Sequence, residues 1–166
     1  MTLTLHENWA PGMVGDIAAL HARVYAASHG FGRAFETTVA TGLGEMLGYL
    51  DPARDFFRAV ESDGRFRGSI ALDASAADGT ARLRYFILDE ALRGRGLGKG
   101  WMEALMAHAR ATRLSYIHLW TLTGLDAATA LYVRAGFVLE EERDATPLFG
   151  APGTARRFGV TLTPPR

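Results

Sequence analysis

The chain contains no cysteine, which excludes disulfide bonds, thiolate metal sites and a cysteine nucleophile. Its 18 Lys and Arg residues balance its 18 Asp and Glu residues, so no excess charge favours nucleic acid or an anionic membrane. No apolar run approaches the ~18 residues of a membrane-spanning helix, and the N-terminus lacks a basic-then-apolar signal. We therefore expect a soluble, cytoplasmic protein that binds neither nucleic acid nor membranes.

The remaining composition is that of an ordinary globular protein. Hydrophobic residues make up 48% of the 166 positions and charged residues 22%. A chain of this length suits one domain with a sizeable core, and no internal repeat or low-complexity segment divides it. We expect a single domain over residues 1–166.

The apolar pattern predicts the element order β, α, α, β, β, β, α, β, α, β, β. The expected strands lie at about residues 2–7, 56–61, 65–72, 81–88, 116–120, from 137 and 157–162. The expected helices lie at about 13–28, 33–50, from the glycine loop to 113, and 126–134. This order is typical of an α+β domain with a mixed, mostly antiparallel sheet of about seven strands flanked by four helices.

A glycine-rich stretch, LRGRGLGKGW at 92–101, joins one expected strand to the next helix. Its glycines at 94, 96, 98 and 100 let the backbone turn sharply and let main-chain N–H groups approach a ligand. The first N–H groups of the helix have no internal partner and carry the positive end of the helix dipole. Together with Arg93, Arg95 and Lys99, they favour an anion such as a phosphate.

Two familiar phosphate-binding loops do not match this stretch. A dinucleotide loop needs G-x-G-x-x-G, but the sixth position counted from Gly94 or Gly96 is not glycine. A Walker loop needs Ser or Thr after Gly-Lys, and Gly100 stands there. The pattern that remains, R-x-x-G-x-G at 93–98, resembles the pyrophosphate-binding motif of the GNAT superfamily of acyl-CoA-dependent N-acetyltransferases.

A second motif strengthens the resemblance. The pattern A-x-x-L-Y-x-x-A-G-F at 128–137 is similar to the second motif of this family. Residues 119–121, 125–128 and the early His21-x-x-x-Tyr25 and Phe35-Glu36 resemble GNAT domains often found behind MarR-type DNA-binding domains. The resemblance covers nearly the whole chain and implies the GNAT fold, with no helix-turn-helix domain expected before it.

The resemblance implies acetyl-CoA as the cofactor. Its pyrophosphate would meet the loop amides, and its pantetheine arm would lie along the exposed edge of the strand before the loop. A backbone N–H near Leu88 would polarise the thioester carbonyl. The cofactor-binding residues implied are Phe86, Ile87, Leu88, Arg93, Gly94, Arg95, Gly96, Leu97, Gly98 and Lys99. No metal site is expected.

The resemblance also implies that Tyr132 is the acid that protonates the thiolate leaving group, the alternative being a packing role on a short helix. Some relatives carry a glutamate base on the central strand, but the comparable position here is Arg82. The general base therefore stays open, with Glu36, His21, His29 and His118 as alternatives to a water relay.

The acceptor side is expected near the two early helices. Arg84 alternates with Phe86 and Leu88 and should share their face of the strand. It either pairs with Glu36 or holds a substrate carboxylate by two parallel hydrogen bonds. The residues expected to bind the acceptor are Tyr25, Glu36, Arg84, Trp120 and Thr121.

The function indicated is transfer of an acetyl group from acetyl-CoA to the amine of a small molecule or amino acid. The transfer would occur by direct attack in a ternary complex. Two alternatives stay open: transfer of a longer acyl group, and a non-catalytic acyl-CoA-binding sensor or partner subunit. The sequence determines neither the acceptor nor whether the chain forms a homodimer.

Overall fold

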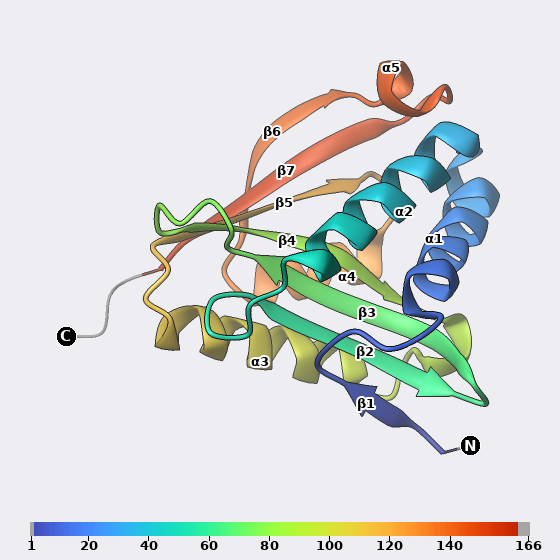
Figure 1. Ribbon diagram of the computed structural model, residues 1–166. Coiled ribbons are helices and arrows are strands. Elements are labelled where there is room, and N and C mark those ends of the chain that lie inside the picture. Colours follow the sequence, from blue (N-terminus) through green and yellow to red (C-terminus); the bar gives the residue numbers. More distant parts are fainter. Residues whose placement is uncertain (1, 163–166) are drawn as a thin grey trace.

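A computed structural model describes residues 2–162 of the chain, in which seven strands form one sheet in the order β1-β2-β3-β4-β5-β7-β6 (Figure 1). The elements are β1 (Thr4–His6), α1 (Met13–His29), α2 (Arg33–Gly48), β2 (Phe56–Ser62), β3 (Arg65–Asp73), β4 (Thr80–Leu88), the 3₁₀ helix η1 (Glu90–Leu92), α3 (Leu97–Ala111), β5 (Tyr116–Leu122), α4 (Asp126–Arg134), β6 (Val138–Asp144), α5 (Thr146–Phe149) and β7 (Thr154–Thr161). The predicted α+β class, mixed sheet and element order are confirmed.

The main difference from the sequence prediction lies near the C-terminus. The turn-rich section contains a fifth α-helix, α5, which has four residues and therefore no apolar period to reveal it. The Asp144 side chain starts this turn by accepting hydrogen bonds from the Thr146 N–H at 2.9 Å and the Thr146 hydroxyl at 2.6 Å. The last strand also begins earlier than predicted, at Thr154, because β7 pairs with β5 on one side and β6 on the other.

The centre of the sheet contains a parallel pair of strands among antiparallel neighbours. β4 and β5 are parallel and pair only over Thr80–Arg82 and Tyr116–His118. Beyond the Arg82–His118 pair the two strands separate, while β3 continues along β4 and β7 along β5. Within residues 2–162, the backbone edges of β4 and β5 that face each other beyond this point have no strand partner.

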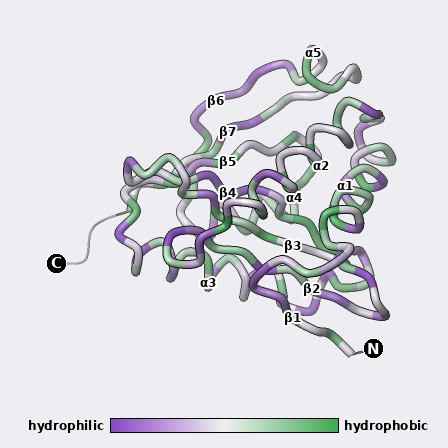
Figure 2. Tube along the Cα trace, in the orientation of Figure 1, coloured by the Kyte–Doolittle hydropathy of each residue, from purple (hydrophilic) through white to green (hydrophobic). Residues whose placement is uncertain are grey.

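Helices cover both faces of the sheet. The largest core cluster joins the sheet to α3 and includes Trp101, Leu105 and Ile117. On the opposite face, Met13 of α1 and Leu43 of α2 belong to a second cluster with residues of β2 and β3 (Figure 1). Every residue of β6 at the sheet edge is exposed, and this strand is largely hydrophilic in Figure 2.

Local sequence explains how α1 and α2 lie against the sheet. Gly30 ends α1 with a φ of 70°, and its N–H donates to the carbonyl oxygen of Ala26 at 3.1 Å. Gly42 in α2 allows a close approach to β4, because a Cβ there would lie 2.5 Å from the Tyr85 hydroxyl oxygen. None of the helices formed by residues 2–162 has the length and apolar character needed to cross a lipid bilayer.

Candidate active site

A cleft of about 720 Å³ opens where β4 and β5 separate. Its lining includes most residues singled out in the sequence: Tyr25, Arg84, Phe86, Ile87, Leu88, Arg93, Gly94, Gly96, Leu97, Gly98, Lys99, Trp120, Thr121 and Tyr132. Two candidates, Arg95 and Glu36, are exposed and do not line it. We call the part formed by residues 86–99 and α4 the loop half, and the part formed by α1, α2, Arg82, Arg84 and Trp120 the far half.

The loop half is built around backbone groups. Gly94 and Gly96 have φ angles of 71° and 79°, which side-chain-bearing residues rarely adopt, and a Cβ on either would have no protein atom within 4 Å. Gly96 precedes α3, whose first internal hydrogen bond runs from the Gly100 N–H to the Gly96 carbonyl oxygen at 3.0 Å. The N–H groups of residues 97–99 are therefore free of helical partners and suit an anion.

The charged residues of the loop have different roles. The Arg93 guanidinium donates from Nε to the Leu88 carbonyl oxygen at 3.0 Å and so fastens the loop to the end of β4. Lys99 lies 3.8 Å from Glu103 in an exposed pair along α3, which holds it only weakly. Lys99 therefore remains available to an anion at the helix N-terminus.

A bulge in β4 separates the two halves of the cleft. One extra residue of β4 lies between the pairs Ala71–Arg84 and Ser69–Ile87, and Tyr85 takes a φ of 52°. The Ser69 hydroxyl donates to the Tyr85 carbonyl oxygen at 2.6 Å and holds this geometry. The bulge breaks the alternation of side chains along β4.

Because of the bulge, the prediction that Arg84 shares a face of the strand with Phe86 and Leu88 is wrong. Phe86 and Leu88 lie toward α3, where a Cβ on Gly98 would contact both. Arg84 lies on the other face, since a Cβ on Gly42 of α2 would be 2.9 Å from its guanidinium. Arg84 therefore does not share a face with Phe86 and Leu88, because strict alternation holds only in a strand without a bulge.

Of the two alternatives that the sequence left open for Arg84, the pair with Glu36 is not formed, because Arg84 contacts another carboxylate. Arg84 Nη1 lies 3.2 Å from Asp73 Oδ2, and the guanidinium carbon lies 4.8 Å from the centre of the Tyr85 ring. The sequence did offer a signal for Asp73, because extending the β3–β4 hairpin places it opposite Arg82.

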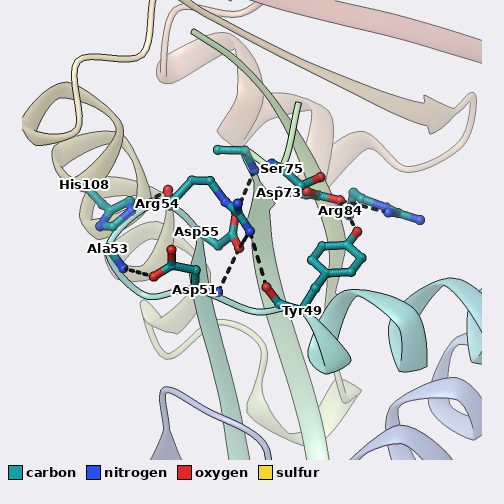
Figure 3. A network of polar contacts seen from close by, with 10 residues as sticks. Tyr49, Asp51, Ala53, Arg54, Asp55, Asp73, Ser75, Arg84 and His108 are labelled. Atoms are coloured by element: carbon teal, nitrogen blue, oxygen red, sulfur yellow. Dashed lines mark hydrogen bonds and ion pairs between the residues drawn. The ribbon is translucent and has the colours of Figure 1, made fainter. Parts of the chain in front are cut away.

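A polar network fixes Asp73 in turn (Figure 3). The Tyr49 hydroxyl donates to Asp73 at 2.9 Å. The adjoining loop is held by Asp55, a buried carboxylate that accepts from the Ala74 N–H at 2.9 Å and is paired with Arg54 at 3.1 Å. Arg84 thus belongs to a structural network that joins β4 to the segment between α2 and β2.

Tyr132 of α4 lies at the boundary between the two halves. Its ring packs against the rings of Phe86, Phe137 and Phe158, with centroids 6.2, 6.1 and 6.2 Å away. Burial raises the pKa of Tyr132, and the neighbouring Tyr25 adds to the rise. The phenol is therefore neutral at physiological pH and can donate a proton.

The far half combines an apolar wall with buried polar groups. Phe35, Val39 and Tyr25 come from α1 and α2, and burial raises the pKa of Tyr25 to about 12. Trp120 of β5 lies opposite, with the Arg143 guanidinium carbon 3.8 Å from its ring centre.

Of the four side chains considered as bases, His21 alone lines the cleft. The Ile17 carbonyl oxygen lies 2.8 Å from its Nδ1, which fixes Nδ1 as the donor and leaves the Nε2 lone pair as an acceptor. Burial lowers the pKa of His21 to about 4, so the ring is neutral. His29 and His118 both lie outside the lining of the cleft. The Nε2 atom of His29 lies 2.8 Å from the Thr123 carbonyl oxygen. His21 can therefore accept a hydrogen bond but holds a proton poorly.

The described part of the chain contains no cluster of three or more His, Cys, Asp or Glu side chains arranged to hold a metal ion. The loop amides instead suit an anionic group such as a phosphate, because the backbone at Gly94 and Gly96 is accessible and the neighbouring side chains are cationic.

Comparison with solved structures finds the same fold in several acetyltransferases. The ribosomal-protein-S18-alanine N-acetyltransferase from Escherichia coli is 19% identical, with a TM-score of 0.68, and the match covers 99% of this chain and 97% of that one. A GNAT-family acetyltransferase from Staphylococcus aureus is 14% identical, with a TM-score of 0.71, covering 98% and 100%. A ribosomal L7/L12 α-N-protein acetyltransferase in complex with coenzyme A is 15% identical, with a TM-score of 0.69, covering 98% and 95%.

No curated protein matches the chain at a significant level. The structural matches share the fold at low identity, and the sequence itself identifies the family. The profile of the family described as "Acetyltransferase (GNAT) family" matches residues 31–137, which is well over half of the chain and contains both the glycine loop and the Tyr132 motif. The chain belongs to the GNAT acetyltransferase family.

Proposed function

We propose that this protein transfers an acetyl group from acetyl-CoA to the amine of a small molecule or amino acid, by direct attack in a ternary complex. The observation that carries the proposal is the position of the Tyr132 phenol. Tyr132 lines the same cleft as the open edge of β4 and the N-terminus of α3, which follows the glycine loop. These are the proton donor, the thioester site and the pyrophosphate site that acyl transfer from a coenzyme A thioester requires.

The loop half suits the cofactor. Bound acetyl-CoA would supply an activated acetyl group and a thiolate leaving group. The N–H groups of residues 97–99, with Lys99, suit the pyrophosphate, and the partner-free edge of β4 from Phe86 to Leu88 suits the amide-containing pantetheine arm. Polarising the thioester carbonyl oxygen requires a hydrogen-bond donor, and a main-chain N–H group of this edge near Leu88 suits that role.

The far half suits the amine. The amine nitrogen forms the new bond to the carbonyl carbon while the carbon–sulfur bond breaks. Tyr132 donates its proton to the departing sulfur. Because the pKa of His21 is only about 4, we assign it the role of orienting the amine through Nε2, with the proton of the amine passing to water.

The experiment is a turnover assay with acetyl-CoA and a panel of small amines, in which release of the free thiol and formation of the acetylated amine are both measured. Stoichiometric formation of both products supports the proposal. Binding of acetyl-CoA without product from any amine supports the alternative of a non-catalytic acyl-CoA sensor, which the lack of a strong base in the cleft favours. Faster turnover with a longer acyl-CoA than with acetyl-CoA would show that the protein transfers a longer acyl group.

A further inference from the structure

The far half of the cleft carries more positive than negative charge. Arg82 and Arg84 both line it, and among the residues that the structure describes only Arg84 has a carboxylate partner, Asp73 at 3.2 Å. Asp73 lies opposite Arg82 in the strand register, but its carboxylate also accepts from the Tyr49 hydroxyl at 2.9 Å and the Ser75 N–H at 3.1 Å. The acid nearest to Arg82 in the sheet is therefore engaged with other donors.

Arg82 itself has no such partner. Among residues 2–162, no carboxylate oxygen lies within 4.0 Å of its guanidinium and no hydrogen bond holds it. Burial lowers the pKa of Arg82, and the charge of Arg84 lowers it further, while Tyr85 and the Asp73 carboxylate raise it. An arginine nevertheless keeps its charge at any physiological pH. Among residues 2–162, Arg82 is thus an accessible cation with no carboxylate in direct contact, at the point where β4 and β5 separate.

Two acids of β6 are engaged with other cations. On β6, Glu142 lies 2.6 Å from Arg156 and Glu140 lies 3.7 Å from Arg157, so both acids have cationic partners on β7. Within the cleft lining, the acidic residue is Asp126, at the start of α4 in the loop half. An acceptor in the far half would therefore meet Arg82 without a competing free carboxylate.

We propose that the acceptor is a small amine that carries a carboxylate, that Arg82 binds this carboxylate, and that Phe35 and Val39 contact the apolar part of the molecule. A guanidinium offers two parallel N–H donors that match the two oxygens of a carboxylate. The inference rests on the proposed function and adds the acceptor class and its recognition residue. Arg84, held by Asp73, is assigned to structure.

The test compares two acceptors that differ only in charge, leucine and leucinamide, with the wild type and an Arg82→Gln variant. We expect kcat/KM for leucine to fall roughly 10- to 100-fold in the variant, through KM, because a charged hydrogen bond is lost. The value for leucinamide should change less than about threefold. Each acceptor is compared with itself across variants, so the different basicities of the two amines cancel.

Arg84→Lys is the matched control, since it alters the neighbouring arginine of the same strand. It should change both acceptors by the same factor, because it disturbs the Asp73 network rather than a substrate contact. Calorimetry with acetyl-CoA should give the same affinity for wild type and Arg82→Gln, which shows that the variant is folded with an intact loop half.

The results separate this inference from the proposed function. Equal losses for leucine and leucinamide in Arg82→Gln would overturn the role of Arg82. A panel in which neutral amines are acetylated and all carboxylate-bearing amines are rejected would overturn the acceptor class while leaving acetyl transfer intact. Absence of transfer to any amine, with acetyl-CoA bound, would overturn the proposed function and this inference with it.

Discussion

The loop half of the cleft comes mainly from one continuous segment of the chain, whereas the far half is assembled from four separate elements. Residues 86–99 supply the loop half almost alone, with α4 added. The far half needs α1, α2, β4 and β5. The groups offered to a ligand also differ: main-chain N–H groups in the loop half, and side chains such as His21, Arg82 and Tyr25 in the far half.

This difference has a consequence for specificity. In the proposed function, main-chain groups of the loop half recognise what all acyl-CoA molecules share, and their geometry depends on a few glycine positions rather than on side-chain identity. The far half is specified by side chains that come from distant parts of the sequence. We therefore expect substitutions in the loop half to affect cofactor binding with every acceptor, and substitutions in the far half to distinguish among acceptors.

Tyr132→Phe should give the largest effect, because Tyr132 lies at the boundary of the two halves and is the proposed proton donor in the chemical step. We expect turnover to fall by roughly 10²- to 10⁴-fold, the usual range for a general acid. Acetyl-CoA affinity should change little, since the phenylalanine ring retains the packing against Phe86, Phe137 and Phe158. Single-turnover kinetics measures the chemical step, and calorimetry measures cofactor affinity.

Tyr25→Phe provides the comparison within the far half, because it removes a second buried phenol of the cleft. Its effect should depend on the acceptor and appear mainly in KM. If both variants lower single-turnover rates equally, or if Tyr132→Phe turns over like the wild type, Tyr132 is not the acid.

The loop half was largely predictable from the sequence, and the physical reason is its local origin. A positive φ favours glycine at the positions of Gly94 and Gly96, and a helix begins directly after them, so the glycine spacing in residues 93–98 indicates this geometry. The order of strands and helices was predictable for a related reason, because each long element has its own apolar period. The four-residue helix α5 has none.

The far half was predicted less well, because its contacts are set by tertiary structure. The β4 bulge moved Arg84 to the opposite face from Phe86, and nothing in the local pattern of residues 82–88 marks the extra residue. Glu36 was expected near the acceptor, but it lies on the exposed side of α2. The β3–β4 register places Asp73 opposite Arg82, two residues from Arg84, and only the tertiary structure shows that Asp73 pairs with Arg84.

Gly96→Val tests the loop half alone. A β-branched residue is strained at a φ of 79°, and it would place a side chain where the pyrophosphate is expected. We expect the dissociation constant for acetyl-CoA to rise roughly 10- to 100-fold, corresponding to the ~1–3 kcal/mol of such backbone strain. Relative rates among different acceptors should stay the same at saturating cofactor.

Gly100→Ala is the matched control for this prediction. Gly100 lies in α3 without a positive φ, and a Cβ there would meet no atom within 4 Å. The variant should bind acetyl-CoA like the wild type and be more stable by up to about 1 kcal/mol, because alanine favours a helix interior. Unchanged affinity in a folded Gly96→Val variant would show that the loop does not bind the cofactor.

The smallest predicted effect concerns stability and comes from His21 in the far half. In the folded protein burial lowers the pKa of His21 from 6.5 to about 4, so the unfolded chain takes up a proton at a higher pH than the folded protein does. The unfolded state therefore binds more protons between these two values, and stability falls as the pH falls. The stabilising contribution is fully present above pH 6.5 and is lost by about pH 4.

Urea unfolding at pH 8 and pH 5 measures this contribution. On moving to pH 5, wild-type protein should lose about 2 kcal/mol more of its unfolding free energy than His21→Gln, since each pKa unit corresponds to ~1.4 kcal/mol. His118→Gln should remove a smaller part, because burial and Arg157 also lower the pKa of this more accessible histidine. If wild type and His21→Gln lose equal stability, His21 is not buried in its neutral form. Its Nε2 would then be able to take up the proton of the amine, and the far half would contain a general base.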